Sequence, residues 1–182
     1  MKEKSMRSEN AFRDAVMLVS HRCLPHVRAL RFANRREAYR RRLVEAVRKG
    51  GVVGLDYLVA PTGLYAVRTP ADPQWTSALM RVLQSGATHD LRRAAATVGS
   101  VWRDRHAVTF VQNGLLLLGV MLAINLHLVA EEKIRHPAQW GQAGWSERVG
   151  IRKRYRTVRQ ENAAEALHMH TDAEDFTQWY ID

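Results

Sequence analysis

The stretch from residue 51 to residue 70, GVVGLDYLVAPTGLYAVRTP, is the part of the chain whose structure follows most directly from its residues. β-Branched, aromatic and aliphatic side chains fill its first half and return after Gly63, which is typical of two strands. Pro61, Thr62 and Gly63 have the composition of a tight turn, and Pro70 ends the second run. The sequence therefore predicts a β-hairpin near the middle of the chain.

The rest of the chain alternates short strands with helices. Apolar spacing predicts strands over residues 23–32 and 106–112 and helices over residues 35–49, 73–98 and 113–129. Asn34 is expected to cap the first helix, and Gly50 and Gly51 are expected to end it. The order of these elements predicts an α+β fold in which helices pack on an antiparallel sheet.

Positive charge is concentrated in the N-terminal part of the chain. The 182 residues contain 28 Lys and Arg against 18 Asp and Glu, and residues 1–50 alone contain 14 against 5. A planar guanidinium binds phosphate through several donors, so this surplus favours a polyanionic partner. For the run from Arg40 to Arg42, a solvated helix face and a phosphate clamp are both consistent with the sequence.

Composition also excludes several classes of protein. Cys23 is the single cysteine, which rules out an internal disulfide and a cysteine-rich zinc site. The first ten residues are polar and lack the apolar core of a signal peptide. Residues 115–130 are apolar but short, and they include Asn125 and His127, which favours a buried helix over a membrane span. We expect a cytoplasmic protein without a membrane partner.

The chain divides into three parts by composition. We expect a polar arm over residues 1–22, one α+β domain over residues 23–150, and a C-terminal extension over residues 151–182. The extension begins with a basic stretch and then carries six acidic side chains and no Lys or Arg from residue 160 onward. Residues 160–182 are either an acidic tail that competes with nucleic acid for the basic surface or a helix that packs on the domain. The apolar side chains through which such a helix would pack are Ala164, Leu167, Phe176, Trp179 and Tyr180.

Three further groups of residues follow the order and spacing of a known protein family. The first contains Pro25, His26, Val27, Arg28, Arg31, Asn34, Arg35 and Arg36, the second contains Gly99, Ser100, Val101 and Trp102, and the third runs from Ile124 through Pro137 and Trp140 to Trp145. Together with the central hairpin they resemble the REP-associated tyrosine transposases, which are single-tyrosine HUH transposases. The resemblance covers residues 24–145. It implies a ferredoxin-like or RRM-like sheet and a single-stranded or hairpin DNA ligand.

The residues that carry the family's chemistry are missing from this sequence. In the family, two histidines on the second hairpin strand hold Mg²⁺ or Mn²⁺, and a tyrosine attacks the phosphate that the metal polarises. Gly63 and Tyr65 stand at the two histidine positions. The nucleophile is expected near Ala87 or Thr88, and the sequence has no tyrosine between residues 66 and 154. We therefore expect a catalytically inactive DNA-binding protein that uses no cofactor.

The resemblance and the charge together indicate which side chains would contact DNA on the sheet. The predicted DNA-binding residues are Arg28, Arg31, Arg35, Arg36, Tyr65, Arg103 and Arg105. Tyr65 either stacks on a base or closes a gap in the core. Trp102 is expected to pack in the core rather than to stack on a base. His127 is expected to be a packed or capping residue rather than a metal ligand.

Three alternatives remain open at the level of sequence. An active DNA-nicking enzyme would use Tyr155 or Tyr65 as its nucleophile, with His26 or His106 recruited to a metal. An RNA-binding module would use the same type of sheet. A protein-interaction scaffold would dimerise through the apolar helix and the acidic tail. Both a monomer and a homodimer are consistent with the sequence.

Overall fold

The computed structural model describes residues 16–27, 29–69, 73–95, 99–111, 114–158 and 160–167. Within them a single antiparallel sheet contains β1 (Val16–Arg22), β2 (Val53–Ala60), β3 (Gly63–Thr69) and β4 (Ala107–Val111), in the order β2-β3-β1-β4. Strand β1 lies at the centre, where it pairs with both β3 and β4. This order is the ferredoxin-like arrangement, and the predicted α+β class is confirmed.

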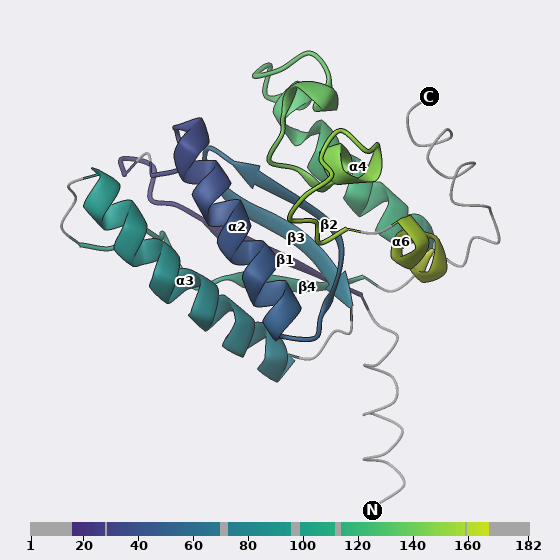
Figure 1. Cartoon of the computed structure of the whole chain (residues 1–182), viewed down its shortest axis with the longest axis horizontal. Helices are drawn as coiled ribbons and strands as arrows, with labels where there is room; N and C mark the ends of the chain where they lie inside the picture. The colour runs from purple at the N-terminus through teal and green to yellow at the C-terminus, as the bar shows by residue number, and fades with distance from the viewer. Residues whose placement is uncertain are drawn as a thin grey trace, which may run out of the picture.

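Helices pack on both faces of the sheet (Figure 1). The helices α2 (Ala33–Lys49) and α3 (Pro73–Ala95) cover one face, where Leu43 and Leu83 meet Val19 of β1 in a buried cluster. On the other face, α4 (Gly114–Ala130), α5 (Gly144–Arg148) and α6 (Gln160–Ala166) pack near β2, and Met121 meets Leu58. A short 3₁₀ turn, η1 (Pro137–Gln139), precedes α5. The period-2 alternation of the strands therefore supplies two cores.

Most of the predicted elements lie within a few residues of their observed positions. The predicted hairpin is confirmed, because β2 and β3 are joined by a two-residue turn at Pro61 and Thr62. Helix α2 ends at Lys49 with Gly50 as its C-cap, as expected. Asn34 is not its N-cap, however. Phe32 occupies that position without a side-chain cap, and the Oδ1 atom of Asn34 accepts a hydrogen bond from the Arg35 amide inside the helix.

The first strand is the main correction to the sequence prediction. The described residues between 23 and 32 contain turns, at residues 25–27 and 29–30, instead of a strand, and β1 consists of residues 16–22, which were expected to belong to the polar arm. Val27 and Leu30 are buried, so the apolar alternation that suggested a strand reflects side chains that pack from a turn. A central strand uses its amide groups in hydrogen bonds to the strands on both sides, and Pro25 has no amide hydrogen to donate.

The described part of the C-terminal extension belongs to the fold. Val158 is fully buried and its backbone forms a parallel bridge with Gly54 at the start of β2. Helix α6 then packs through Ala163, Ala164 and Leu167. The predicted packing of a C-terminal helix is confirmed for Ala164 and Leu167, whereas the aromatic residues beyond residue 167 lie outside the described residues. No helix in the described ranges is long and apolar enough to cross a membrane.

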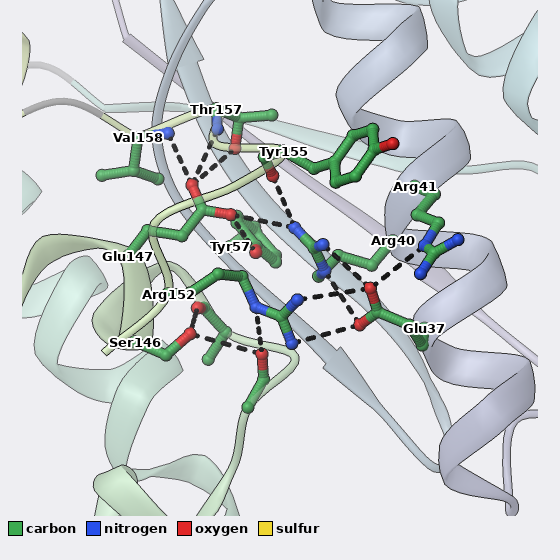
Figure 2. Close-up of polar contacts among 12 residues, drawn as sticks. Glu37, Arg40, Arg41, Tyr57, Ser146, Glu147, Arg152, Tyr155, Thr157 and Val158 are labelled. Atoms are coloured by element: carbon green, nitrogen blue, oxygen red, sulfur yellow. Dashed lines mark hydrogen bonds and ion pairs between the residues drawn. The ribbon is translucent and has the colours of Figure 1, made fainter. Parts of the chain in front are cut away.

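A buried arginine joins this C-terminal segment to α2 (Figure 2). The Nη1 atom of Arg40 lies 3.2 Å from the Oε1 atom of Glu147, and both side chains are completely buried. The same guanidinium bonds Glu37 at 2.9 Å and donates to the carbonyl oxygen of Tyr155 at 2.7 Å. Both sequence interpretations of Arg40 are therefore wrong, since it is neither a solvated residue nor a phosphate clamp. Of its two neighbours, Arg42 is paired with Asp90.

The Glu147 carboxylate is fully used by hydrogen bonds (Figure 2). Its Oε1 atom also accepts from the Tyr57 hydroxyl at 2.5 Å, and its Oε2 atom accepts from the amides of Thr157 and Val158 at 2.7 Å and 2.9 Å. One carboxylate thus ties α5 to α2, to β2 and to the chain that leads into α6. Full satisfaction of its acceptors compensates for removing the charge from water.

We predict that Glu147→Ala destabilises the fold by about 3–5 kcal/mol, because it removes the buried partner of the Arg40 charge and leaves the amides of Thr157 and Val158 without their acceptor. Chemical denaturation at neutral pH would measure the change in unfolding free energy. Arg41→Ala is the matched control, since that side chain is 59% exposed, and it should change stability by less than about 0.5 kcal/mol. Equal losses of unfolding free energy in the two variants would contradict the structural role assigned to Glu147.

Candidate functional site

A pocket of about 570 Å³ opens beside the turn between β2 and β3. We call it the hairpin pocket. The turn residues Pro61 and Thr62 and residues 23–25 form part of its wall. The side chains that carry its chemistry are Arg22, Arg31, Tyr65, Arg103, His127 and Glu131. Three guanidinium groups against one carboxylate give it a positive field, which favours an anionic ligand.

Strand pairing brings the three arginines together from separate segments. Arg22 is the last residue of β1 and pairs with Gly63 of β3. The amide of Arg103 donates to the carbonyl oxygen of Arg22 at 3.0 Å, and the adjacent Trp102 forms a bridge with Cys23. Arg31 comes from the turn region that follows β1. The backbone hydrogen bond thus fixes Arg22 and Arg103 close to each other, and Arg31 reaches the pocket from the loop before α2.

Two rings form another part of the pocket. Tyr65 lies on the face of β3 that packs against α4, and its ring centroid is 5.0 Å from that of His127 on α4. The Nε2 atom of His127 lies 3.5 Å from a carboxylate oxygen of Glu131. Both rings are partly buried, so each presents only part of its surface to the pocket. An aromatic surface beside guanidinium groups is the arrangement with which proteins bind unpaired bases.

The structure places the predicted DNA-binding residues in different surroundings. Arg31, Tyr65 and Arg103 line the hairpin pocket. Arg105 is exposed but is not part of its wall, and Arg35 lies on α2 with its guanidinium 4.9 Å from the ring centroid of Phe32. Arg28 lies outside the described residues.

Arg36 has a structural role that the sequence did not indicate. It is only 7% exposed. Its Nη1 atom donates to the carbonyl oxygens of Leu30 and Arg31, at 2.9 Å and 2.5 Å, and its guanidinium lies 4.2 Å from the ring centroid of Trp140. Because these contacts use its donors, we do not include Arg36 among the side chains that meet a ligand.

Sequence reasoning missed Arg22, His127 and Glu131 as pocket residues. Arg22 was assigned to the polar arm, because the strand that ends with it was placed too late in the sequence. His127 lies on α4 and Glu131 directly follows its last residue, with the Glu131 amide donating to the His127 carbonyl oxygen at 3.0 Å, so the two side chains lie on one side of this helix end. That spacing was visible in the sequence, but only the packing of α4 against β3 shows that this side meets Tyr65.

Gly63 has no room for any side chain. A Cβ atom at this position would collide with the carbonyl oxygen of His21 and would lie 2.9 Å from the Cα atom of Arg22. A histidine therefore does not fit at position 63, where the resemblance led us to expect the first metal ligand of the family, and Tyr65 offers only a phenol at the second expected position. Within the described ranges, no group of three or more His, Cys, Asp or Glu side chains could hold a metal ion.

The other residues considered for catalysis lie away from the hairpin pocket. Ala87 and Thr88 are on α3, which covers the opposite face of the sheet from Tyr65, and Thr88 accepts a hydrogen bond from the Trp102 indole at 2.8 Å. Trp102 packs against the buried cluster, which confirms the core role predicted for it. Neither His26 nor His106 lines the hairpin pocket.

His21 packs on the face of the sheet that α3 covers. Its ring is buried, lies 4.1 Å from the ring of Trp102 and has its Nε2 atom 3.1 Å from the side-chain amide nitrogen of Gln84. Its pKa is lowered from 6.5 to about 4, chiefly because burial disfavours the charged ring; a hydrogen bond with the Asp104 backbone raises the pKa, and the nearby His106 lowers it. His21 is therefore neutral near pH 7.

Comparison with known proteins identifies a similar fold. No protein-family model matches the sequence, and no curated protein matches it. Among solved structures, a REP-associated tyrosine transposase bound to a REP hairpin is similar, with a TM-score of 0.64 and 13% sequence identity over 76% of this chain and 81% of that chain. The likeness shows that the two chains share an α+β fold.

We predict that Gly63→Ala destabilises the fold by about 1–3 kcal/mol or more, because the methyl group would force β1 away from β3. Thermal or chemical denaturation would measure the loss. Gly119→Ala on α4 is the control, since its Cβ would have open space around it and alanine favours a helix. Equal effects of the two substitutions would show that the strands can separate freely at Gly63.

We predict a pH dependence of stability that comes from His21. The unfolded chain binds a proton at this histidine with an ordinary pKa of about 6.5, whereas the folded protein binds it only near pH 4. Stability should therefore fall as the pH decreases through this interval, by about 2.5 kcal/mol between about pH 7 and pH 4.5. His21→Phe should remove this share of the pH slope, and substitution of the exposed His89 by Asn should keep it.

Proposed function

We propose that this chain binds single-stranded or hairpin DNA at the hairpin pocket and does not cleave it. The observation that carries the proposal is the convergence of Arg22, Arg31 and Arg103 around an open pocket that Tyr65 also lines. Guanidinium groups contact backbone phosphates, and an aromatic face accepts an unpaired base. A volume of about 570 Å³ is sufficient for a nucleotide-sized group.

The shape of the surrounding sheet supports an extended ligand rather than a small one. Ala107 and Thr109 of β4 are exposed, and Leu18 of the neighbouring strand β1, which pairs with Thr109, is only partly buried. These residues share the face of the sheet on which Tyr65 lies. A strand of nucleic acid that enters the hairpin pocket can therefore continue across this part of the sheet.

The similar transposase structure supports the choice of a hairpin ligand. That protein is bound to a REP hairpin, and its fold matches three quarters of this chain. A hairpin offers both a phosphate backbone for the arginines and unpaired bases for Tyr65. A regular duplex keeps its bases stacked, so it would use only the charges.

The residues at positions 63 and 65, where the resemblance places the family's metal ligands, support the absence of cleavage. Gly63 offers no ligand atom, and the approach of β1 prevents a larger side chain there. A Tyr65 phenol binds a divalent ion only as a phenolate, which is costly near neutral pH. A tyrosine at the nucleophile's position is also missing. We propose that the fold was kept while the strand-transfer chemistry was lost.

A binding panel tests the proposal. Labelled hairpin DNA, unstructured single-stranded DNA, duplex DNA and RNA would be titrated across a salt series, with and without Mg²⁺. We expect salt-sensitive, Mg²⁺-independent binding to the hairpin or the single strand and no cleaved product. Preferential RNA binding would favour an RNA-binding module, and Mg²⁺-dependent nicks would show an active enzyme. No binding to any of the four would favour a protein-interaction scaffold.

The fold does not test two expectations from the sequence, namely the location of the protein in the cell and its oligomeric state. A cytoplasmic location stays a prediction that imaging of a tagged protein can check. The choice between monomer and homodimer requires a measured molar mass, with and without the hairpin.

Substitution of two pocket arginines should weaken binding in a way that depends on salt. If Arg31 and Arg103 each contact one phosphate, Arg31→Gln with Arg103→Gln should reduce the slope of log affinity against log salt by about 1.4 for a single strand, or about 0.7 per contact. The control is Arg81→Gln on α3, which also removes an exposed charge. An unchanged slope in the double variant would exclude these phosphate contacts.

Tyr65 distinguishes a stacking role from a packing role. If its ring stacks on a base, Tyr65→Leu should weaken hairpin binding by about 1–3 kcal/mol, and Tyr65→Phe should bind as the natural protein does. If Tyr65 only fills space beside His127, both variants should bind equally well. Titrations at one salt concentration and denaturation curves of both variants would separate these outcomes.

A further inference from the structure

A second basic pocket lies between α2 and the segment of residues 141–155, with a volume of about 530 Å³ (Figure 2). We call it the α2 pocket. Arg41 and Glu37 contribute to it from α2, and the later segment contributes Arg152, Lys153, Arg154 and Tyr155. None of these residues lines the hairpin pocket, so the two pockets are separate features of the surface.

The α2 pocket keeps a positive surplus after its internal ion pairs are counted. Glu37 is its one carboxylate, and it lies 3.3 Å from Arg41 and 3.2 Å from Arg152, in addition to its contact with the buried Arg40. Burial alone would raise the pKa of Glu37, but its hydrogen bonds and charge contacts with the arginines, Arg40 above all, lower it. Four basic side chains therefore face one ionised carboxylate.

Lys153 and Arg154 supply the free part of this charge. Both side chains are exposed, and neither makes an ion pair within the described part of the chain. Exposed cations that already have acidic partners add little to the field outside the protein. Cations without such partners are available to an anionic ligand.

The segment that carries these residues is held in one conformation. The buried Arg40 donates to the Tyr155 carbonyl at 2.7 Å, and Glu147 binds the amides of Thr157 and Val158 directly after it (Figure 2). Tyr155 has a φ of 55°, a backbone conformation that residues other than glycine rarely adopt. Such conformations persist where the surrounding contacts impose them, and they are frequent at binding sites.

The buried network also presents the Tyr155 ring to the exterior. Tyr155 is 50% exposed, and the guanidinium of Arg41 lies 5.5 Å from its ring centroid. The pair combines a flat aromatic surface with an adjacent positive charge. Tyr65 and the arginines of the hairpin pocket form a similar combination.

The contact between Arg36 and Trp140 adjoins residues of both pockets. Arg36 donates to the backbone of Arg31, which lines the hairpin pocket, and its guanidinium packs on the Trp140 ring. Gly141, the next residue in the chain, lines the α2 pocket. A ligand that spans the Arg36–Trp140 contact therefore meets basic side chains on both sides of it.

From these contacts we infer that the α2 pocket is a second subsite for the nucleic acid bound at the hairpin pocket. Lys153 and Arg154 bind backbone phosphates, and the Tyr155 ring, with the Arg41 guanidinium beside it, stacks on a base. This inference rests on the proposed function and adds a length requirement to it, because a ligand must extend past the Arg36–Trp140 contact to reach both pockets.

The test compares two ligands with the full-length protein. One is a hairpin without a tail, and the other is the same hairpin with a single-stranded extension of about ten nucleotides at either end, which spans a typical single-strand site. Lys153→Gln with Arg154→Gln should reduce the salt slope for the extended ligand by about 1.4 and should leave the short ligand unaffected. Tyr155→Leu should weaken the extended ligand at least about fivefold, and Tyr155→Phe should not.

Arg48→Gln with Lys49→Gln is the matched control. It removes the same two types of charge from consecutive exposed residues at the far end of α2. The inference predicts no change in the salt slope for this control with either ligand. Equal losses in the two double variants would overturn it, because the effect would then come from net charge alone. Arg41→Gln provides an independent check if the variants at residues 153–155 fold poorly.

The remaining outcomes distinguish the inference from the proposal on which it rests. If substitution of Arg31 and Arg103 weakens both ligands while the variants at Lys153, Arg154 and Tyr155 weaken neither, the α2 pocket is not a subsite and the proposed function stands. If the natural protein binds neither ligand, the proposed function fails and the inference fails with it.

Discussion

The ion pair between Arg40 and Glu147 is the contact on which the arrangement of this protein depends. Taking two charges out of water costs several kcal/mol, so such a pair persists only where every remaining donor and acceptor is satisfied. Here α2 supplies the cation, α5 supplies the anion, and the amides of Thr157 and Val158 complete the carboxylate's acceptors. Satisfying one buried charge therefore fixes the path of the chain from α5 to α6, including the basic segment at the α2 pocket.

A second constraint acts at the opposite end of the sheet, where β1 approaches β3 at Gly63. This approach has two consequences for the site. The pairing of β1 with β3 holds Arg22 beside the hairpin turn, and the close approach of β1 excludes any side chain at position 63. A histidine at position 63 would thus require a movement of β1, which also pairs with β4. The pairing of β1 with β3 therefore both places Arg22 at the hairpin pocket and keeps position 63 free of a side chain.

Local chemistry explains which elements could be predicted from the sequence. The hairpin and helices α2, α3 and α4 follow from turn residues and apolar periodicity, which act over a few neighbouring positions. Strand β1 was misplaced because its apolar run is followed by another, in residues 23–32, that has a similar alternation. Only the hydrogen bonds to β3 and β4 select the first run, since Pro25 cannot join a central ladder. The pocket arginine Arg22 was missed for the same reason.

The sequence by itself determined the α+β class, the basic character and the lack of the two histidines, because these depend on residue types and short-range order. The tertiary structure decided how each charge is used. Arg40 and Arg36 resemble their neighbours in a basic run, yet they are buried and bonded to protein, while Arg31 and Arg103 meet at one pocket from distant positions. Burial and pairing depend on residues far away in the chain, so no local pattern distinguishes a structural arginine from one that is free to bind a ligand.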